Sequence, residues 1–248
     1  MDPRDRLPEA AAVVLAGGSG TRVGADRNKV YLPLAGRSVI AWSLAALAAT
    51  PGVGPLVLVV READRAAAAA VLAGDETLGR VETVIGGATR QESELAGLRV
   101  LADRIHGGAV DAVLIHDGAR PLAGTALAAE VLRVARESGG AVPGLRRDDL
   151  AVAAPDGRTL TGPAAGLVAV QTPQGFRAAP LLAAYEAAAR AGFAGTDTAS
   201  CVAEFAPELP VRWIPGEERN FKITHRHDLE LADQVLGRVR QGLRPAAQ

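Results

Sequence analysis

Residues 11–29 of the chain are AAVVLAGGSGTRVGADRNK, and this stretch decides the fold. Its first five residues are apolar and partly β-branched, which is typical of a buried strand. The strand runs into a loop whose backbone can pass close to a ligand, because four residues lack a Cβ: Gly17, Gly18, Gly20 and Gly24. Successive backbone N–H groups in such a loop form a concavity that holds anions. Since Arg22 and Lys29 add two cations, the pattern favours a nucleoside triphosphate site over an ordinary glycine-rich turn.

Two better-known phosphate-binding motifs do not fit this loop. The P-loop requires GxxxxGK followed by Ser or Thr, and no Lys-Ser or Lys-Thr pair follows a glycine here. The dinucleotide fingerprint GxGxxG matches at Gly18 and Gly20, but Val23 occupies the position of the third glycine. The residues that follow, through Asn28 and Pro33, do not resemble the start of a helix.

Composition bounds the class of protein. The 248 residues suffice for one large α/β domain or two small ones, and a hydrophobic content of 48% supports a sizeable core. A net charge of −1 and an aromatic content of 3% argue against nucleic-acid partners. The lone cysteine, Cys201, excludes an internal disulfide, fits a reducing compartment and is expected to be buried. No apolar run reaches the ~18 residues of a membrane span, and residues 1–9 lack the apolar core of a signal peptide, so we expect a cytoplasmic protein without membrane contact.

Predicted strands alternate with predicted helices along the chain. We expect strands at residues 11–15, 56–60, 81–85, 111–115, 140–142, 167–170 and 211–214. We expect helices at residues 38–49, 64–73, 91–103, 126–138, 178–191, 197–205 and 228–240. This alternation predicts an α/β fold, with a mostly parallel sheet covered by helices on both faces. No linker or domain boundary is visible, so residues 1–248 are expected to form a single domain.

Residues 145–163 interrupt this alternation. Alternating side chains around Asp156-Gly157 predict a β-hairpin. An isolated hairpin is marginally stable in water, so this segment needs a surface on which to pack. A second copy of the chain would supply that surface, and the alternative is a hairpin that lies on its own domain.

Four polar clusters lie at or just beyond predicted strand ends, where parallel sheets place their ligands. They occupy residues 86–93, residues 116–120, residues 171–176 together with 196–200, and residues 220–224. In the first, glycines let the backbone reach a base edge and Ser93 adds a hydroxyl; in the second, Asp117 is poised for a metal or a sugar hydroxyl. The third offers hydroxyls and amides for a phosphate or polyol, and in the fourth Lys222 lies between apolar neighbours that favour an inward direction. Each cluster also has an interpretation without a ligand. In the same order, these are a tight turn, a capping aspartate, two helix N-caps and a solvated lysine.

Taken together, these clusters resemble the 2-C-methyl-D-erythritol 4-phosphate cytidylyltransferase family of the non-mevalonate isoprenoid route. The glycine loop alone resembles nucleotidyltransferases in general. Four motifs narrow the resemblance: HDGARP (116–121), QTPQGF (171–176), TDTAS (196–200) and NFKIT (220–224). The resemblance implies a Rossmann-like nucleotidyltransferase fold with a protruding β-hairpin arm. It also implies transfer of CMP from CTP to a polyol phosphate, with release of pyrophosphate.

The resemblance implies a role for each matched residue on the nucleotide side. The triphosphate cradle would be the backbone of four residues: Ala16, Gly17, Gly18 and Gly20. Arg22 and Lys29 would bind the triphosphate and stabilise the reaction. Gly87 and Ser93 would lie on the cytidine side.

Other matched residues belong to the acceptor side. Asp117 and Arg120 would hold the polyol and the metal region, with Asp117 as a ligand of Mg²⁺, and Lys222 would act in catalysis. The remaining substrate-binding residues would be Asp149, Thr172 and Thr196. In the family, the arm of residues 145–163 reaches across a homodimer and completes the acceptor pocket of the partner.

Three departures from the family pattern bear on the acceptor. Residues 28–31 are AsnLysValTyr instead of ProLysGlnTyr, which keeps the lysine. Asp148-Asp149 stands where the arm usually carries AspThr, and Ala164 stands where it usually supplies an arginine to the acceptor phosphate. An added carboxylate and a lost cation weaken phosphate binding, and the cations available to compensate are Arg146, Arg147 and Arg158. The alternatives are therefore a cytidylyltransferase for another polyol phosphate, such as ribitol 5-phosphate, and a non-catalytic nucleotide-binding paralogue.

Overall fold

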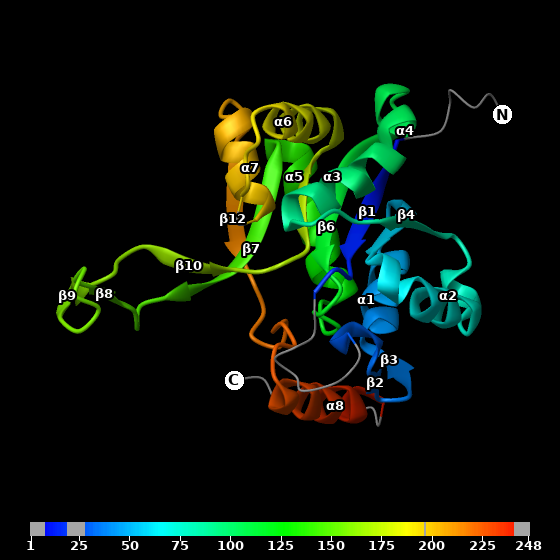
Figure 1. The fold of residues 1–248 in the computed structure, drawn as a ribbon, viewed down its shortest axis with the longest axis horizontal. Coiled ribbons are helices and arrows are strands. Elements are labelled where there is room, and N and C mark those ends of the chain that lie inside the picture. Colours follow the sequence, from blue (N-terminus) through cyan, green and yellow to red (C-terminus); the bar gives the residue numbers. More distant parts are fainter. Residues whose placement is uncertain (1–7, 19–27, 196, 241–248) are drawn as a thin grey trace.

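The computed structural model describes residues 8–18, 28–195 and 197–240, and its centre is an eight-stranded sheet (Figure 1). The strand order is β10-β7-β11-β6-β1-β4-β5, and β12 pairs with β7 outside this path. The strands are β1 (Glu9–Leu15), β4 (Val53–Val60), β5 (Val81–Ile85), β6 (Val110–Asp117), β7 (Gly140–Arg147), β10 (Leu167–Val170), β11 (Gln174–Arg177) and β12 (Val211–Pro215). β1 runs parallel to both neighbours, with Leu15 opposite Asp117 of β6 and Val59 of β4. The carboxyl ends of these three strands therefore meet at one edge of the sheet.

Helices cover both faces of the sheet, because alternate side chains of β1 are buried on opposite faces. Ala10, Ala12 and Val14 pack with α1, α2 and α5, whereas Ala11 and Val13 pack with α3, α4, α6 and α7. These helices are α1 (Val39–Ala48), α2 (Arg65–Ala73), α3 (Arg90–Val100), α4 (Ala102–His106), α5 (Thr125–Ser138), α6 (Ala178–Arg190) and α7 (Thr198–Phe205). The predicted α/β class is confirmed. Across the described ranges, every helix is too short or too polar to pass through a bilayer.

Besides the two layers of buried apolar side chains on the faces of the sheet, a third and smaller hydrophobic cluster lies beyond its carboxyl edge, at the bottom of Figure 1. Here α8 (Arg226–Arg240) packs against a short hairpin of β2 (Pro33–Leu34) and β3 (Arg37–Ser38). Ile223 is fully buried in this cluster, and its N–H donates to the Ala119 carbonyl oxygen at 2.8 Å. The cluster therefore brings the segment before α8 against the loop that follows β6.

The segment between β7 and β10 forms an arm that projects from the sheet (Figure 1). At its tip, β8 (Ala151–Ala153) pairs with β9 (Leu160–Pro163). Gly157 in the turn has a φ of 66°, a conformation that favours glycine, and the Asp156 side chain accepts hydrogen bonds from the backbone N–H groups of Arg158 and Thr159. The predicted hairpin is confirmed. Val152 and Leu160 are 50% and 70% exposed, so the hairpin does not lie on its own domain.

Several elements differ from the sequence prediction, among them the β2–β3 hairpin, which was not predicted, and β4, which begins at Val53 instead of residue 56. The helix expected at residues 91–103 is divided into α3 and α4, because Leu101 N–H bonds to the Leu98 carbonyl oxygen and tightens the turn. The strand expected at residues 140–142 extends to Arg147, since β10 and β12 both pair with it. β11 is absent from the prediction. Its four residues include a glycine, and it forms because it fits antiparallel between β6 and β7.

Candidate active site

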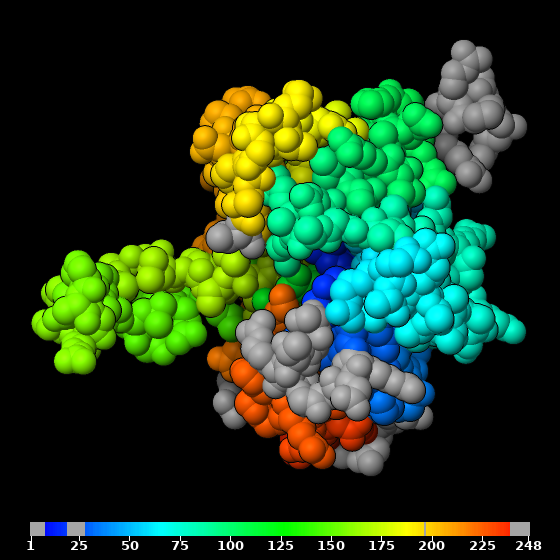
Figure 2. Space-filling view, viewed as in Figure 1, coloured from blue at the N-terminus to red at the C-terminus, as the bar shows by residue number. Residues whose placement is uncertain are grey.

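A cavity of about 310 Å³ opens at the carboxyl edge of the sheet. The dark blue end of the first described segment lies in a depression near the centre of Figure 2. Predicted site residues from five parts of the chain line the cavity: Gly17, Gly18, Lys29, Gly87, Ser93, Asp117 and Lys222. This volume is at the lower end of the range for small-molecule sites. Three other predicted residues, Gly20, Arg22 and Thr196, lie outside the described residues.

Asn28 ties the two ends of the glycine loop together. Its Nδ2 group donates to the Ala16 carbonyl oxygen at 2.7 Å and to Asp64 Oδ2 at 2.8 Å. Arg61 fixes Asp64 in turn through Nε at 2.6 Å and Nη2 at 2.9 Å. The Asn28 side chain also caps the 3₁₀ turn that carries Lys29. Lys29 therefore reaches the cavity from a support anchored beside Ala16.

Asp117 is the charged centre of the site. Its Oδ1 lies 2.6 Å from Arg90 Nη1, and its Oδ2 lies 2.9 Å from Lys222 Nζ and 3.7 Å from Arg120 Nε. Burial alone would raise the pKa of this carboxyl, but the charges of Arg90, Lys222 and Arg120 outweigh burial and hold the pKa well below its usual range. Asp117 is therefore an anion at neutral pH.

The two lysines of the whole sequence, Lys29 and Lys222, both line this cavity. Lys222 is directed at Asp117, as its apolar neighbours Phe221 and Ile223 predict. A lysine ammonium is a compact point charge that suits contact with a single phosphate or carboxylate oxygen. The cavity thus combines two such charges with the carboxylate of Asp117.

His116 and Thr172 fix the backbone at Asp117. The Thr172 hydroxyl accepts the Asp117 N–H at 3.0 Å and lies 3.1 Å from His116 Nδ1. His116 Nε2 lies 3.3 Å from the Arg120 carbonyl oxygen. All of these groups have hydrogen-bond partners when the Thr172 hydroxyl donates to Nδ1 and the Nε2–H group donates to the Arg120 carbonyl oxygen. This arrangement requires a neutral imidazole. Complete burial lowers the pKa of His116 to about 4, in agreement with this assignment.

We expect His116 to make the protein less stable as the pH falls from 6.5 to 4. Its pKa is lowered from 6.5 to about 4 in the folded protein, so in this interval the unfolded chain binds a proton that the folded chain does not. The stabilisation is complete above pH 6.5, and about 3 kcal/mol is lost by pH 4. Urea unfolding across this interval measures the slope. His116→Gln should remove most of it, and an unchanged slope in the variant would contradict the assignment.

The N-terminus of α3 forms the cavity wall that faces the glycine loop. Thr89 and Glu92 form a capping box, in which each side chain accepts the backbone N–H of the other. A Cβ at Gly87 would lie 2.3 Å from Glu92 Cβ, so this close approach requires glycine. A Cβ at Gly17 would lie 4.0 Å from Ser93 Oγ. The predicted cytidine-side residues therefore lie beside the described part of the predicted triphosphate loop, in the lining of the same cavity.

Asp117 and Lys222 line the cavity, but three other predicted acceptor-side residues do not. Arg120 is 12% exposed, and its Nη1 donates to the Asn220 carbonyl oxygen at 2.6 Å. Thr172 is 4% exposed and directs its hydroxyl to His116 and the Asp117 backbone. Asp149 lies on the arm. The structure therefore gathers most nucleotide-side residues, while Arg120, Thr172 and Asp149 do not line the cavity of the same chain.

Glu94 has no place in the sequence prediction, although it belongs to the charge network of the site. It is buried in α3, and its Oε1 lies 2.9 Å from Arg90 Nε. One signal was available, because Glu94 falls on the same helical face as Leu98 and adjoins Leu95, which marks a carboxylate on a buried stripe. Arg90 lies one turn earlier on the same helix, whereas Tyr185 and Thr198 come from distant helices, and the sequence carries no signal of those two contacts.

Comparisons with known proteins agree with this geometry. The sequence model of the family described as "IspD: 2-C-methyl-D-erythritol 4-phosphate cytidylyltransferase" matches residues 10–238. The protein of that name from Thermobifida fusca is 39% identical over 243 residues, which cover 94% of this chain and 96% of the relative. The 2-C-methyl-D-erythritol 4-phosphate cytidylyltransferase from Cereibacter sphaeroides is 40% identical over 227 residues, which cover 91% of this chain and 96% of the relative.

Solved structures are similar over nearly the same extent. The 4-diphosphocytidyl-2C-methyl-D-erythritol synthase of Anaerococcus prevotii has a TM-score of 0.79 at 26% identity, covering 93% of this chain and 97% of that one. The 2-C-methyl-D-erythritol 4-phosphate cytidylyltransferase of Thermus thermophilus has a TM-score of 0.67 at 31% identity, covering 92% and 98%. Since sequence and structure match over nearly the whole length, this chain belongs to the 2-C-methyl-D-erythritol 4-phosphate cytidylyltransferase family.

Proposed function

We propose that the chain transfers CMP from CTP to 2-C-methyl-D-erythritol 4-phosphate. The products are 4-diphosphocytidyl-2-C-methyl-D-erythritol and pyrophosphate, in non-mevalonate isoprenoid biosynthesis. The family match supports this assignment. The observation that carries it is the cavity at the end of β1, where Lys29, Lys222 and Asp117 converge beside the glycine loop. Backbone amides and cations together suit a triphosphate.

This chemistry needs no base from the protein. A phosphate oxygen of the acceptor attacks the α-phosphorus of CTP, and the bond from that phosphorus to the bridging oxygen of pyrophosphate breaks. The acceptor phosphate has a second pKa of ~6, so its oxygen is already an ionised nucleophile at neutral pH. The barrier lies in the negative charge that develops at the α-phosphorus and on pyrophosphate. Lys29 and, by the family pattern, Arg22 neutralise this charge.

Position supports the other proposed roles. The backbone from Ala16 to Gly18, continued by Gly20, cradles the triphosphate. Gly87 and Ser93 face the cytidine, because they line the cavity beside the loop. Lys222 adds a second cation beside Asp117. Arg120, Thr172 and Thr196 act on the acceptor side, where Arg120 and Thr172 hold the Asp117 loop in place.

We propose magnesium as the cofactor and Asp117 as the residue that holds it. Among the described residues, no three His, Cys, Asp or Glu side chains gather into a metal cage. Mg²⁺ in phosphoryl-transfer sites usually takes one or two carboxylates and completes its shell with substrate phosphates and water. Asp117, the one carboxylate among the described residues that line the cavity, is ionised and fits that donor set. When bound, the ion supplies positive charge to the triphosphate, while Arg90 and Lys222 keep the carboxylate in place.

The identity of the acceptor depends on the arm. Asp149 is paired with Arg147 through Nε and Nη2, both at 2.7 Å, which neutralises the carboxylate that departs from the family pattern. Ala164 supplies no cation for the acceptor phosphate. Ribitol 5-phosphate is therefore the rival acceptor, and a non-catalytic nucleotide-binding protein is the alternative from another class.

Release of pyrophosphate from CTP, measured across a panel of polyol phosphates, tests the proposed function. The highest kcat/KM is expected with 2-C-methyl-D-erythritol 4-phosphate. A higher kcat/KM with ribitol 5-phosphate would transfer the assignment to that acceptor. Calorimetric binding of CTP without turnover on any acceptor would overturn the assignment as an enzyme.

We also propose that two copies of the chain pair through the arm, in the cytoplasm. Large apolar side chains on the arm and at its base lack cover from their own chain: Leu150, Val152, Leu160, Leu167 and Trp213. A second copy would cover this surface and receive the arm on its acceptor side. A buried, unpaired Cys201 agrees with a reducing compartment. Sedimentation should find a dimer that Leu160→Glu weakens, and a monomeric wild-type protein would contradict the pairing.

A further inference from the structure

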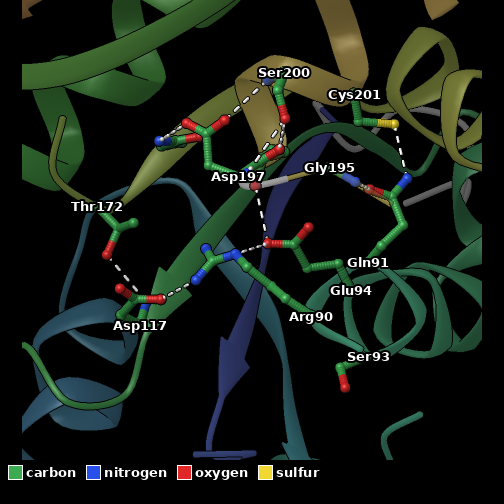
Figure 3. Close-up of polar contacts among 12 residues, drawn as sticks. Arg90, Gln91, Ser93, Glu94, Asp117, Thr172, Gly195, Asp197, Ser200 and Cys201 are labelled. Carbon is green, nitrogen blue, oxygen red and sulfur yellow. Dashed lines mark hydrogen bonds and ion pairs between the residues drawn. The ribbon is translucent and has the colours of Figure 1, made fainter. Parts of the chain in front are cut away.

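Arg90 bridges two buried carboxylates, as Figure 3 shows. Its Nη1 lies 2.6 Å from Asp117 Oδ1, and its Nε lies 2.9 Å from Glu94 Oε1. The Glu94 side chain is 1% exposed, and the Asp117 side chain is 10% exposed. The guanidinium therefore donates a hydrogen bond to Asp117 and forms an ion pair with Glu94 through another of its nitrogen atoms.

Two hydroxyl groups from other helices also hold the Glu94 carboxylate. The Thr198 hydroxyl of α7 donates to Glu94 Oε1 at 3.1 Å, and the Tyr185 hydroxyl of α6 donates to Oε2. Burial raises the pKa of the Glu94 carboxyl, while Arg90 and the two hydroxyls oppose this rise. The carboxylate therefore has partners on both oxygens, and three helices meet at it.

Helix packing alone does not require a carboxylate at this position. Leu95 and Leu98, on the same side of α3, are buried among apolar residues. A buried charge is costly unless good geometry and further hydrogen bonds offset its loss of hydration. Glu94 does not line the cavity, and among the described residues that do, the one it pairs with is Arg90. Its charge is therefore best explained by what it does to Arg90.

We propose that Glu94 is a positioning residue for CMP transfer. Glu94 pairs with Arg90 Nε, while Arg90 Nη1 pairs with Asp117. Through Arg90, Glu94 keeps the Asp117 carboxylate directed at Lys222 and the nucleotide cavity. Through Thr198, which begins α7 and belongs to the acceptor-side motif of residues 196–200, it also links that motif to the same carboxylate. This inference rests on the proposed function, since its main readout is turnover.

Glu94→Gln removes the charge and keeps the shape of the side chain. We expect kcat to fall about 10- to 100-fold, the range found when a residue that orients a functional group is lost. The KM for CTP should change little, because the loop and both lysines remain in place. Glu186→Gln is the matched control. Glu186 also joins α6 to α3, through Arg99 at 2.8 Å, but on the exposed side of these helices, and this variant should keep the wild-type kcat.

A double-mutant cycle separates positioning from stability. Because Glu94 acts through Arg90, Glu94→Gln should cost no further kcat in an Arg90→Gln background. A further loss as large as in the wild-type background, or a wild-type kcat for Glu94→Gln alone, would overturn the proposal.

If Glu94→Gln does not fold, two further variants test the positioning role of Glu94. Tyr185→Phe and Thr198→Val keep the carboxylate and each remove one hydroxyl that holds it, so each should lower kcat by less than the loss of the charge. A wild-type kcat in both would overturn the positioning role. An absence of wild-type turnover would instead overturn the proposed function, so the two failures are distinguishable.

Discussion

Asp117→Asn is expected to lower kcat by about 10³-fold, the largest effect of any single substitution in the site. The carboxylate is the anion that Arg90 and Lys222 surround, and the amide leaves both cations without their partner. An amide is also a weaker ligand for the magnesium ion that we propose at this position. Steady-state release of pyrophosphate at saturating CTP measures the loss.

The same substitution is expected to destabilise the fold by about 3 kcal/mol, because removing one member of a buried ion pair leaves the others uncompensated. Asp111→Asn is the matched control. Asp111 lies on the same strand, β6, and pairs with Arg136 at 2.8 and 2.9 Å, away from the cavity. It should keep the wild-type kcat. An equal loss of kcat in both variants, or no loss at Asp117, would contradict the central position of this carboxylate.

Lys29→Met is expected to lower kcat by about 10²-fold or more, the scale of losing one aimed electrostatic group. Lys29 is 7% exposed and lines the cavity with Gly17 and Gly18. Methionine fills a similar volume without the charge. The variant therefore loses stabilisation of the transition state, in which pyrophosphate gains negative charge. We expect Arg22→Ala to lose turnover to a similar extent, on the sequence pattern alone.

Arg37→Met is the control for these two cations. Arg37 lies on the nearby β2–β3 hairpin, where it pairs with Asp75 outside the cavity. Arg37→Met removes one positive charge, as Lys29→Met and Arg22→Ala each do, and should leave kcat unchanged. Near-normal turnover in both Lys29→Met and Arg22→Ala would refute their assigned roles.

Local patterns in the sequence predict the carboxyl edge of the sheet. The apolar run of β1 ends directly in the glycine loop, and Asp117 directly follows the apolar residues of β6. Because parallel strands end at the same edge of a sheet, the sequence places both motifs at that edge, and the pairing of β1 with β6 in the structure makes them neighbours. The hairpin at Asp156-Gly157 was also predictable, since the turn chemistry lies within a few residues.

Contacts that depend on packing between distant elements could not be predicted from these patterns. Lys222 and Asp117 are 105 residues apart, and α8 brings them together by packing on the β2–β3 hairpin. Asn28 appeared only as a departure from the family motif, because its partner Asp64 belongs to the turn after β4. Glu94 interrupts an apolar helical stripe, but the helices that supply its partners are placed only by the folded core.

A crystal structure of the chain with CTP and magnesium tests the central claim most directly. We expect the triphosphate to lie along Ala16 to Gly18 in contact with Lys29, and the cytosine to lie beside Gly87 and Ser93. A nucleotide bound at another place, with this cavity left empty, would contradict it.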